Sequence, residues 1–194
     1  MAYIGMRNPV VAPITGHTDG SAITYGNGMV IGPAVSANVT FDTGDNPDYG
    51  DDVIIDNDRG VNGYSITLET NDISTAARAA CLGWIAKTGT GTTVTEYEVT
   101  DDEPPKVGFG FIRVKMLRGV KKYEGFWFHK LQFVDGGENA STKQKQITWN
   151  HPTMTGYGIG SYIDSSGKAK YFSWMEFDTE AAAKTWLNAK AHIT

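Results

Sequence analysis

The sequence predicts a mainly β protein, an antiparallel β-sandwich or open barrel flanked by one internal and one C-terminal α-helix. Three observations predict this fold. Several segments alternate apolar and polar residues, turn signals rich in Gly, Asn and Asp separate them, and only two segments have helical composition. Short turns between neighbouring strands favour antiparallel pairing, and 194 residues suffice for one substantial core.

Charge and composition narrow the function classes. The chain carries 17 Lys and Arg against 22 Asp and Glu, a formal net charge of -5. This acidic balance argues against a protein whose main task is to grip phosphate backbones, because such proteins are usually basic. The single cysteine, Cys81, forms no internal disulfide framework, and no segment has the roughly 20 apolar residues of a membrane helix. We therefore expect a protein made in the cytoplasm, with no signal peptide and no membrane anchor.

The N-terminal half divides into a lead-in and the start of the main domain, which we place at residues 29–194. Residues 1–28 show weak periodicity, so we expect an N-terminal arm or an irregular lead-in there. AVSANVTF (34–41) and GYSITLET (63–70) alternate cleanly and predict two half-buried strands. Between them, residues 42–60 hold seven aspartates, which predicts a long acidic loop with at most a short strand at its VII sequence.

A helix is predicted at 71–83, where alanines favour helix, Asp72 or Ser74 can cap its start and Gly83 ends it. The remaining predicted elements are strands at 93–100, 107–117, 123–134 and 142–150, a closing hairpin of 156–163 with 168–177, and a helix at 178–190 capped by Asp178. The strands at 107–117 and 123–134 form the strongest predicted hairpin, because the short segment RGVKK joins them.

The strand YEGFWFHKLQFV (123–134) is apolar on both faces. By alternation, one face carries Tyr123, Trp127, Leu131 and Phe133, and the other carries Phe126, Phe128 and Val134. One face packs into the protein's own sandwich, and the second needs a cover, which is either a neighbouring subunit or the last helix. The candidates for this subunit-covered or helix-covered face are Phe126, Phe128 and Trp149, and those for helix packing on the sheet are Trp186 and Leu187.

No arrangement of residues predicts catalysis. The sequence lacks a G-x-S-x-G elbow, a P-loop and a dinucleotide fingerprint, and its four histidines lie far apart. The aspartates of 42–60 lack the order and the terminal Glu of an EF-hand. A solvated loop is the default interpretation, while cation binding and contact with basic residues of another subunit stay open. We expect no enzyme activity, no cofactor and no metal site.

Several segments occur in a recognisable order over about residues 30–190. An acidic segment precedes YSITLET, a short helix ends in CLGW, and a Pro-containing stretch precedes VGFGFIRVKM. The aromatic strand YEGFWFHKLQF, the segment STKQKQITWNHPTMTGYG and a closing helix with a Trp follow. In pattern and order, though not in any invariant motif, the chain resembles the major tail proteins, or tail tube proteins, of phages with long non-contractile tails.

The resemblance implies a structural virion protein that self-assembles into stacked, hexameric rings. These rings form the tail tube, the conduit for DNA ejection, and the protein is assembled in the host cytoplasm. The implied partners are other copies of the chain, the tape-measure protein, the tail terminator and distal tail or baseplate proteins, while genomic DNA passes through the lumen without specific binding. The resemblance also implies that the acidic loop reaches an adjacent ring. The residues expected at that inter-ring or inter-subunit contact are Asp45, Asp48, Asp51 and Asp52.

A second function class stays open from the residues alone. A monomeric β-sandwich binding module, for a carbohydrate or a receptor, would use exposed aromatic side chains as a binding platform. The two classes differ in oligomeric state, since rings or tubes indicate the first and a glycan-binding monomer indicates the second.

Overall fold

The structure is a computed structural model that describes residues 2–88, 94–137 and 150–194. Most strands belong to one nine-stranded antiparallel sheet. Its strands are β1 (Ala2–Gly16), β2 (Thr24–Tyr25), β3 (Met29–Val30), β4 (Ala34–Thr43), β7 (Val61–Thr70), β10 (Lys106–Leu117), β11 (Val120–Asp135), β12 (Thr153–Ile159) and β13 (Phe172–Phe177). The other elements are the hairpin of β5 (Asn46–Gly50) and β6 (Val53–Asp58), the hairpin of β8 (Ile85–Thr88) and β9 (Val94–Glu98), and helices α1 (Thr75–Leu82) and α2 (Glu180–Ala191). The predicted class, mainly β with one internal and one C-terminal helix, is confirmed.

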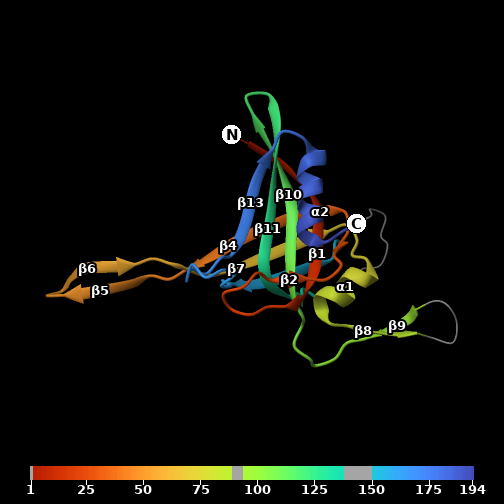
Figure 1. Cartoon of the computed structure of the whole chain (residues 1–194), viewed down its shortest axis with the longest axis horizontal. Coiled ribbons are helices and arrows are strands. Elements are labelled where there is room, and N and C mark those ends of the chain that lie inside the picture. The colour runs from red at the N-terminus through yellow and green to blue at the C-terminus, as the bar shows by residue number, and fades with distance from the viewer. Residues whose placement is uncertain (1, 89–93, 138–149) are drawn as a thin grey trace, which may run out of the picture.

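The large sheet folds over on itself to make a sandwich. Its order is β2-β1-β10-β11-β12-β7-β4, with β13 beside β11 and β3 beside β1. In Figure 1, β10, β11 and β13 run nearly vertically, β4 and β7 run across them, and α2 lies along the vertical strands. Rings join the two layers: the centroid of Tyr64 lies 5.1 Å from that of Phe128, and Phe41 lies 5.6 Å from Phe172.

A β-bulge in β11 allows this folding. Along one edge, β11 pairs first with β13 and then with β12. Phe128 lies opposite Phe109 of β10, whereas Leu131 lies opposite Val107, so β11 has one residue more than β10 in this interval. An extra residue turns the following side chains to the other face. Leu131 and Phe133 therefore lie on the same side as Phe128, and the face predicted for them from simple alternation is wrong.

Each face of β11 is buried in a different core. The inter-layer core lies between the crossing strands and includes Val11, Tyr64, Ile66, Leu68, Cys81, Phe109, Phe111, Phe128, Leu131 and Phe133. The helix-side core lies under α2 and consists of Val10, Ala12, Ile112, Trp127, Ala183, Leu187 and Ala191. Both Trp127 and its neighbour Phe128 are almost fully buried, at 0% and 1% exposed. The expected cover over Phe128 by a second subunit or the last helix is therefore wrong, because rings of β7, β10 and β13 cover it and α2 covers Trp127 instead.

The expectation of an N-terminal arm or an irregular lead-in at residues 1–28 is wrong, because most of residues 2–28 belong to the sheet. The 15-residue strand β1 pairs with β10 along most of its length. Val10 enters the helix-side core and Val11 enters the inter-layer core. A strand buried on both faces shows no alternation, and a register shift between Arg7 and Val10, where Asn8 has φ 53°, disturbs the pattern further.

Both helices begin at a side-chain cap. The Ser74 hydroxyl accepts a hydrogen bond from the Ala77 amide at 3.2 Å, and α1 ends at Gly83 with φ 75°. In α2 the cap is Thr179, whose hydroxyl accepts from the Ala182 amide at 3.3 Å. The predicted cap, Asp178, is one residue too early, and its carboxylate forms an ion pair with Lys122 of β11.

The first prediction concerns the contact of α2 with the sheet. Leu187→Ala should lower the free energy of unfolding by about 2–5 kcal/mol, because Leu187 is fully buried against Trp127 and the truncated side chain leaves a cavity. Urea unfolding of the purified protein measures this change. The matched variant Lys184→Ala, on the exposed side of α2, should change it by less than about 0.5 kcal/mol. A Leu187→Ala value as small as the control would show that α2 does not contribute to the core.

Candidate assembly surfaces

The segment predicted as a long acidic loop is largely a β-hairpin. Strands β5 and β6 project away from the body of the protein (Figure 1). Asp51 and Asp52 form its two-residue turn with φ 48° and 63°, which is the backbone sign that a type I′ hairpin turn requires. The expectation of a long loop with at most one short strand is therefore wrong, although the strand anticipated at VII lies within β6.

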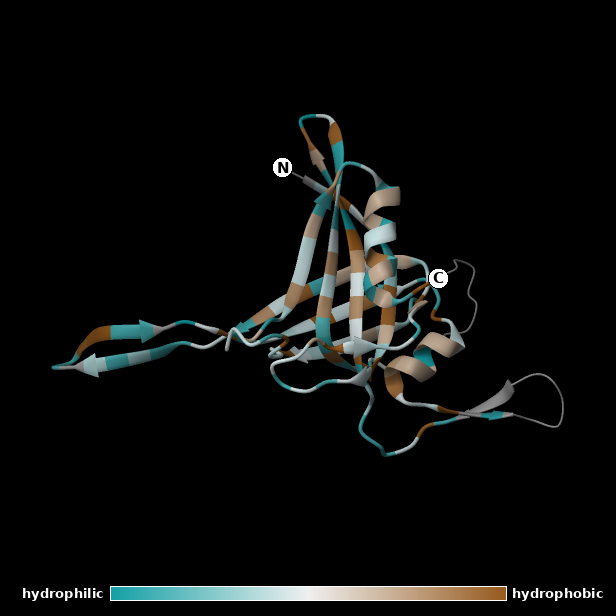
Figure 2. Cartoon of the chain, in the orientation of Figure 1, coloured by the Kyte–Doolittle hydropathy of each residue, from teal (hydrophilic) through white to brown (hydrophobic). Residues whose placement is uncertain are grey.

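The projecting hairpin, which we call the acidic arm, carries exposed apolar side chains. Tyr49, Val53, Ile54 and Ile55 are 63%, 64%, 53% and 71% exposed. Figure 2 shows the apolar stretch of β6 on this projecting element. A two-stranded hairpin by itself is at best marginally stable in water, and a cluster of exposed apolar residues commonly marks a protein contact. The arm therefore gains stability from any surface that covers it.

The arm and its base carry the net charge of the whole chain. Residues 45–59 contain six aspartates and one arginine, which equals the formal net charge of -5, so the rest of the chain is balanced. Asp48 lies directly opposite Asp56 across the two strands. Like charges in such cross-strand positions are destabilising, and an approaching cation would relieve this repulsion.

The four aspartates predicted at a contact occupy different parts of the arm. Asp51 and Asp52 are at its tip, Asp48 is in the middle of β5, and all three are exposed. Asp45 lies at the base, where its Oδ1 accepts hydrogen bonds from Asn57 Nδ2 at 2.7 Å and from Arg59 Nε at 3.2 Å. Asp45 is thus partly neutralised within its own chain.

A second surface lies where the aromatic rings of the inter-layer core reach solvent. The ring of Phe111 stacks on Phe126 at 5.4 Å, and Phe126 stacks on Trp174 of β13 at 6.4 Å. Phe111 is buried, Phe126 is half-buried and Trp174 is 57% exposed. Tyr3 of β1 is 54% exposed and belongs to the same surface through Arg113. We call Tyr3, Arg113, Phe126 and Trp174 the Trp174 surface.

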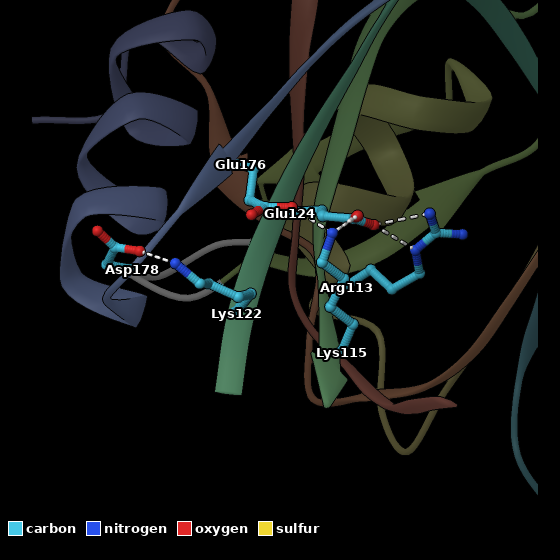
Figure 3. Close-up of polar contacts among 6 residues, drawn as sticks. All are labelled: Arg113, Lys115, Lys122, Glu124, Glu176 and Asp178. Carbon is cyan, nitrogen blue, oxygen red and sulfur yellow. Dashed lines mark hydrogen bonds and ion pairs between the residues drawn. The ribbon is translucent and has the colours of Figure 1, made fainter. Parts of the chain in front are cut away.

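Arg113 is held in place by rings and by a carboxylate. Its guanidinium carbon lies 3.9 Å from the ring centroid of Tyr3 and 4.8 Å from that of Phe126. Its Nε and Nη2 donate to Glu124 Oε2 at 2.9 and 2.7 Å. Figure 3 shows the third nitrogen pointing away from Glu124, and no hydrogen bond joins this Nη1 to the part of the chain that the structure describes. The Nη1 edge of the guanidinium thus remains available to a ligand carboxylate.

Glu124 anchors an ionic network behind Arg113 (Figure 3). Its carboxylate is almost completely buried and also accepts a hydrogen bond from Lys115 Nζ at 2.8 Å, and Lys115 is in turn paired with Glu176. Burial is the largest influence on the pKa of Glu124 and opposes ionisation, but the bonds from Lys115 and Arg113 together outweigh it and lower the pKa. Bonds to Glu124 and Glu176 raise the pKa of Lys115. Both groups are therefore charged at neutral pH.

The turn between β10 and β11 adds cations at the end of the same layer. Arg118 and Lys121 are exposed, and neither forms an ion pair within residues 2–88, 94–137 and 150–194. In contrast, Lys122 pairs with Asp178, and Arg7 pairs with Glu180 at 2.5 Å. The charges that remain uncompensated at this end of the molecule are therefore positive.

The outer face of β4, β7 and β12 has a different character. Thr40, Ser65 and Tyr157 lie side by side across the three strands. A shallow hollow at one end is lined by Phe41, Asp42, Tyr157 and Ile159, among others. Phe41 is 41% and Tyr157 60% exposed. This face is rich in hydroxyl groups with a small apolar hollow.

His129, at the bulge of β11, is buried and neutral. Its Nε2 lies 3.0 Å from Ser173 Oγ, and its backbone carbonyl accepts a hydrogen bond from the Tyr25 hydroxyl at 2.9 Å. Burial, followed by the charges of Lys190 and Lys170, lowers the pKa of His129 to about 4. The imidazole is therefore a neutral polar core group that carries a single ring proton at neutral pH.

The remaining sequence candidates are placed as follows. Leu187 is fully buried against Trp127. Trp186 is half-buried, with its ring 5.9 Å from that of Phe177, and it lies so close to Gly125 that a Cβ there would approach it to 2.8 Å. Trp149 lies outside the described residues.

The sequence reasoning did not identify Tyr3, Arg113, Glu124 or Trp174. One signal was available in the alternation of this strand. Phe109 and Phe111 point into the core, and Arg113 and Lys115 are the next two residues on the same face. Two cations continuing the buried face of a strand require buried carboxylates opposite them. That signal indicates an ionic network, but it does not identify which strand supplies the acids.

No family model matches this chain, and no curated protein matches it. Within the described residues, no group of three or more His, Cys, Asp or Glu side chains is arranged to hold a metal ion. No helix in the described ranges is long and apolar enough to cross a membrane.

The second prediction concerns pH and His129. The folded state holds His129 neutral with a pKa of about 4, whereas the unfolded chain binds a proton near pH ~6.5, so stability falls as the pH drops through this interval. This group should contribute a loss of roughly 2 kcal/mol between about pH 7 and pH 5. His129→Gln should remove most of that slope in urea unfolding, while His192→Gln, at an exposed histidine, should retain it. Equal slopes in all three proteins would contradict a buried neutral His129.

The third prediction concerns the ionic network. Glu124→Gln should lower the urea midpoint more than Glu176→Gln does, because Glu124 is buried between two cations and Glu176 is exposed. The stability from Glu124 is present above its unfolded pKa of ~4.3 and is lost as the pH falls through its lower folded pKa. The Glu124→Gln protein should therefore lose less stability in acid than the wild type. A smaller midpoint change for Glu124→Gln than for Glu176→Gln would show that the network does not depend on Glu124.

Proposed function

We propose that this protein is a tail tube subunit, copies of which form rings that stack into a hollow tube. The observation that carries the proposal is the acidic arm, which exposes Tyr49, Val53, Ile54 and Ile55 on an element with little support of its own. Such an arm is useful to a protein that meets other copies of itself and is a liability to a solitary one. The resemblance of the sequence to phage major tail proteins adds to this argument.

The edges of the sheet also support assembly. Among the described strands, β4 pairs only with β7 and β13 pairs only with β11. Within the described ranges each of these strands has one side without a backbone partner, and open edges are sites where another chain can continue a sheet. Lateral contacts in a ring would use these edges, and the acidic arm would connect one ring with the next.

The hydroxyl-rich outer face of β4, β7 and β12 is suited to line the lumen. Thr40, Ser65, Thr67 and Thr155 give it small neutral side chains. Tight binding of DNA depends on Lys and Arg contacts to phosphates, and these rows contain none. DNA would pass such a wall without being held. The tape-measure protein would occupy the same space before ejection, and the terminator and distal tail proteins would close the two ends.

One observation supports a second function, the binding of a carbohydrate. The hollow lined by Phe41, Asp42 and Tyr157 combines exposed rings with a carboxylate, and this combination can hold a sugar ring by stacking and hydrogen bonding. A monomeric carbohydrate-binding module would use this face. The arm then has no role, which is the reason that we favour assembly.

The fourth prediction tests assembly directly. The full chain, examined over a range of concentrations by sedimentation velocity and negative-stain microscopy, should form rings or tubes. Replacing Asp45, Asp48, Asp51 and Asp52 together by Asn should weaken tube formation or change its salt dependence, because the arm loses most of its charge while its fold is preserved. A wild-type chain that stays monomeric into the millimolar range and binds oligosaccharides would contradict the proposal and support the second function.

A further inference from the structure

We propose that the acidic arm of one copy docks on the Trp174 surface of a second copy, with Asp48 and Asp56 facing Arg113 and Val53 packing on the rings. The inference rests on the proposed function, since it assigns the arm's receiving surface within an assembly of identical chains. The segment that occupies the Trp174 surface is the β5–β6 hairpin of another protomer.

The two surfaces carry the same pattern with opposite charge. In the register of the arm, Asp48 lies opposite Asp56 and Gly50 lies opposite Val53, which places Val53 on the same face as the two aspartates. On the Trp174 surface a guanidinium lies between the rings of Tyr3 and Phe126. A pair of carboxylates beside an apolar side chain thus meets a cation beside aromatic rings.

Arg113 has the geometry of an anchor for these carboxylates. Glu124 and the two rings fix its orientation, while Nη1 points away from Glu124 (Figure 3). A guanidinium that is already ordered loses little conformational entropy when it binds a second carboxylate, and Arg presents several donors in one plane. In return, the added cation would relieve the repulsion between Asp48 and Asp56.

The long-range charge favours the same pairing. The arm and its base carry five net negative charges, while Arg118 and Lys121, at the end of the layer that bears the Trp174 surface, have no ion-pair partner among the described residues. A second exposed aromatic surface among the described residues is the hollow lined by Phe41 and Tyr157, but it contains the carboxylate of Asp42. An acidic arm would be repelled there. Charge therefore favours docking of the arm on the Trp174 surface over docking in the hollow.

The fifth prediction compares two substitutions of matched exposure. Trp174→Asp, at a residue that is 57% exposed, places a negative charge in the docking surface, and Tyr157→Asp, at one that is 60% exposed, places the same charge in the hollow. Trp174→Asp should raise the critical concentration for tube formation by about tenfold or more, the effect expected when a central aromatic contact is lost. Tyr157→Asp should leave it unchanged within about twofold. Thermal unfolding of each variant checks that the protomer remains folded.

A mixing experiment identifies the two halves of the contact. An arm variant, Asp48→Lys with Asp56→Lys, retains an intact Trp174 surface, and Trp174→Asp retains an intact arm. At a concentration where the wild type just forms tubes, neither variant should form them alone. Their mixture should form paired rings or heterodimers, because only one of the two arms can dock. Oxidation of a Val53→Cys chain mixed with a Trp174→Cys chain should give a covalent dimer, and a Val53→Cys chain mixed with a Val134→Cys chain should not. Cys81 is fully buried and does not interfere.

The outcomes separate the inference from the function on which it rests. Wild-type tubes together with normal assembly of Trp174→Asp would overturn the inference and leave the proposed function intact. Loss of assembly in Tyr157→Asp alone would place the contact on the hollow and overturn the inference. If both substitutions prevent assembly, formation of the Val53–Trp174 crosslink decides for the inference and its absence decides against it. A wild-type chain that never assembles would overturn both.

Discussion

The bulge at His129 and Lys130 is the constraint on which the rest of this structure depends. One extra residue in β11 turns the strand's later side chains to the opposite face. At the same point, the partner along the outer edge of β11 changes from β13 to β12. The same strand can then bury Trp127 under α2 and Phe128 between the crossing layers. Without the bulge, Leu131 and Phe133 would point toward the helix side and the inter-layer core would lose two of its large side chains. The sandwich is therefore organised around one interruption of a regular ladder.

The same ladder that builds the core also builds the surface. Rings run outward along neighbouring strands from Phe109 and Phe128, through Phe111 and Phe126, to the exposed indole of Trp174. The next row along these strands is charged rather than aromatic, with Arg113 opposite Glu124 and Glu124 opposite Glu176. A buried carboxylate is tolerated there because two cations reach it. Packing of the core thus fixes the orientation of the exposed arginine, which a flexible surface side chain would not have.

Sequence alone predicted the elements whose two faces differ. Alternation identified β4 and β7, and the short segment around Arg118 and Gly119 identified the hairpin of β10 and β11, whose two turn residues have positive φ. It missed β1, because Val10 and Val11 are buried on opposite faces and alternation disappears there. The predicted closing hairpin is reduced to a single bridge between Ser161 and Lys170, because β12 and β13 take longer-range partners. Long-range pairing and bulges are properties of the whole chain, which is why local patterns did not reveal them.

The sequence of the aromatic strand suggested that either a neighbouring subunit or the last helix covers the second face of β11. In the structure, this strand is covered within the protomer and gives no reason for assembly. Trp127, Phe128 and Phe133 are covered within the protomer, so β11 supplies no large unsatisfied surface. Other apolar side chains are exposed, and those on the acidic arm and around Trp174 are accompanied by charge. Contacts of this mixed kind are sensitive to partner and to salt in a way that a purely apolar interface is not. In the proposed assembly, the charges on these surfaces would repel copies that approach in the wrong orientation. In the proposed tube, the charges would determine which neighbour binds, and the apolar side chains would stabilise the contact once it has formed.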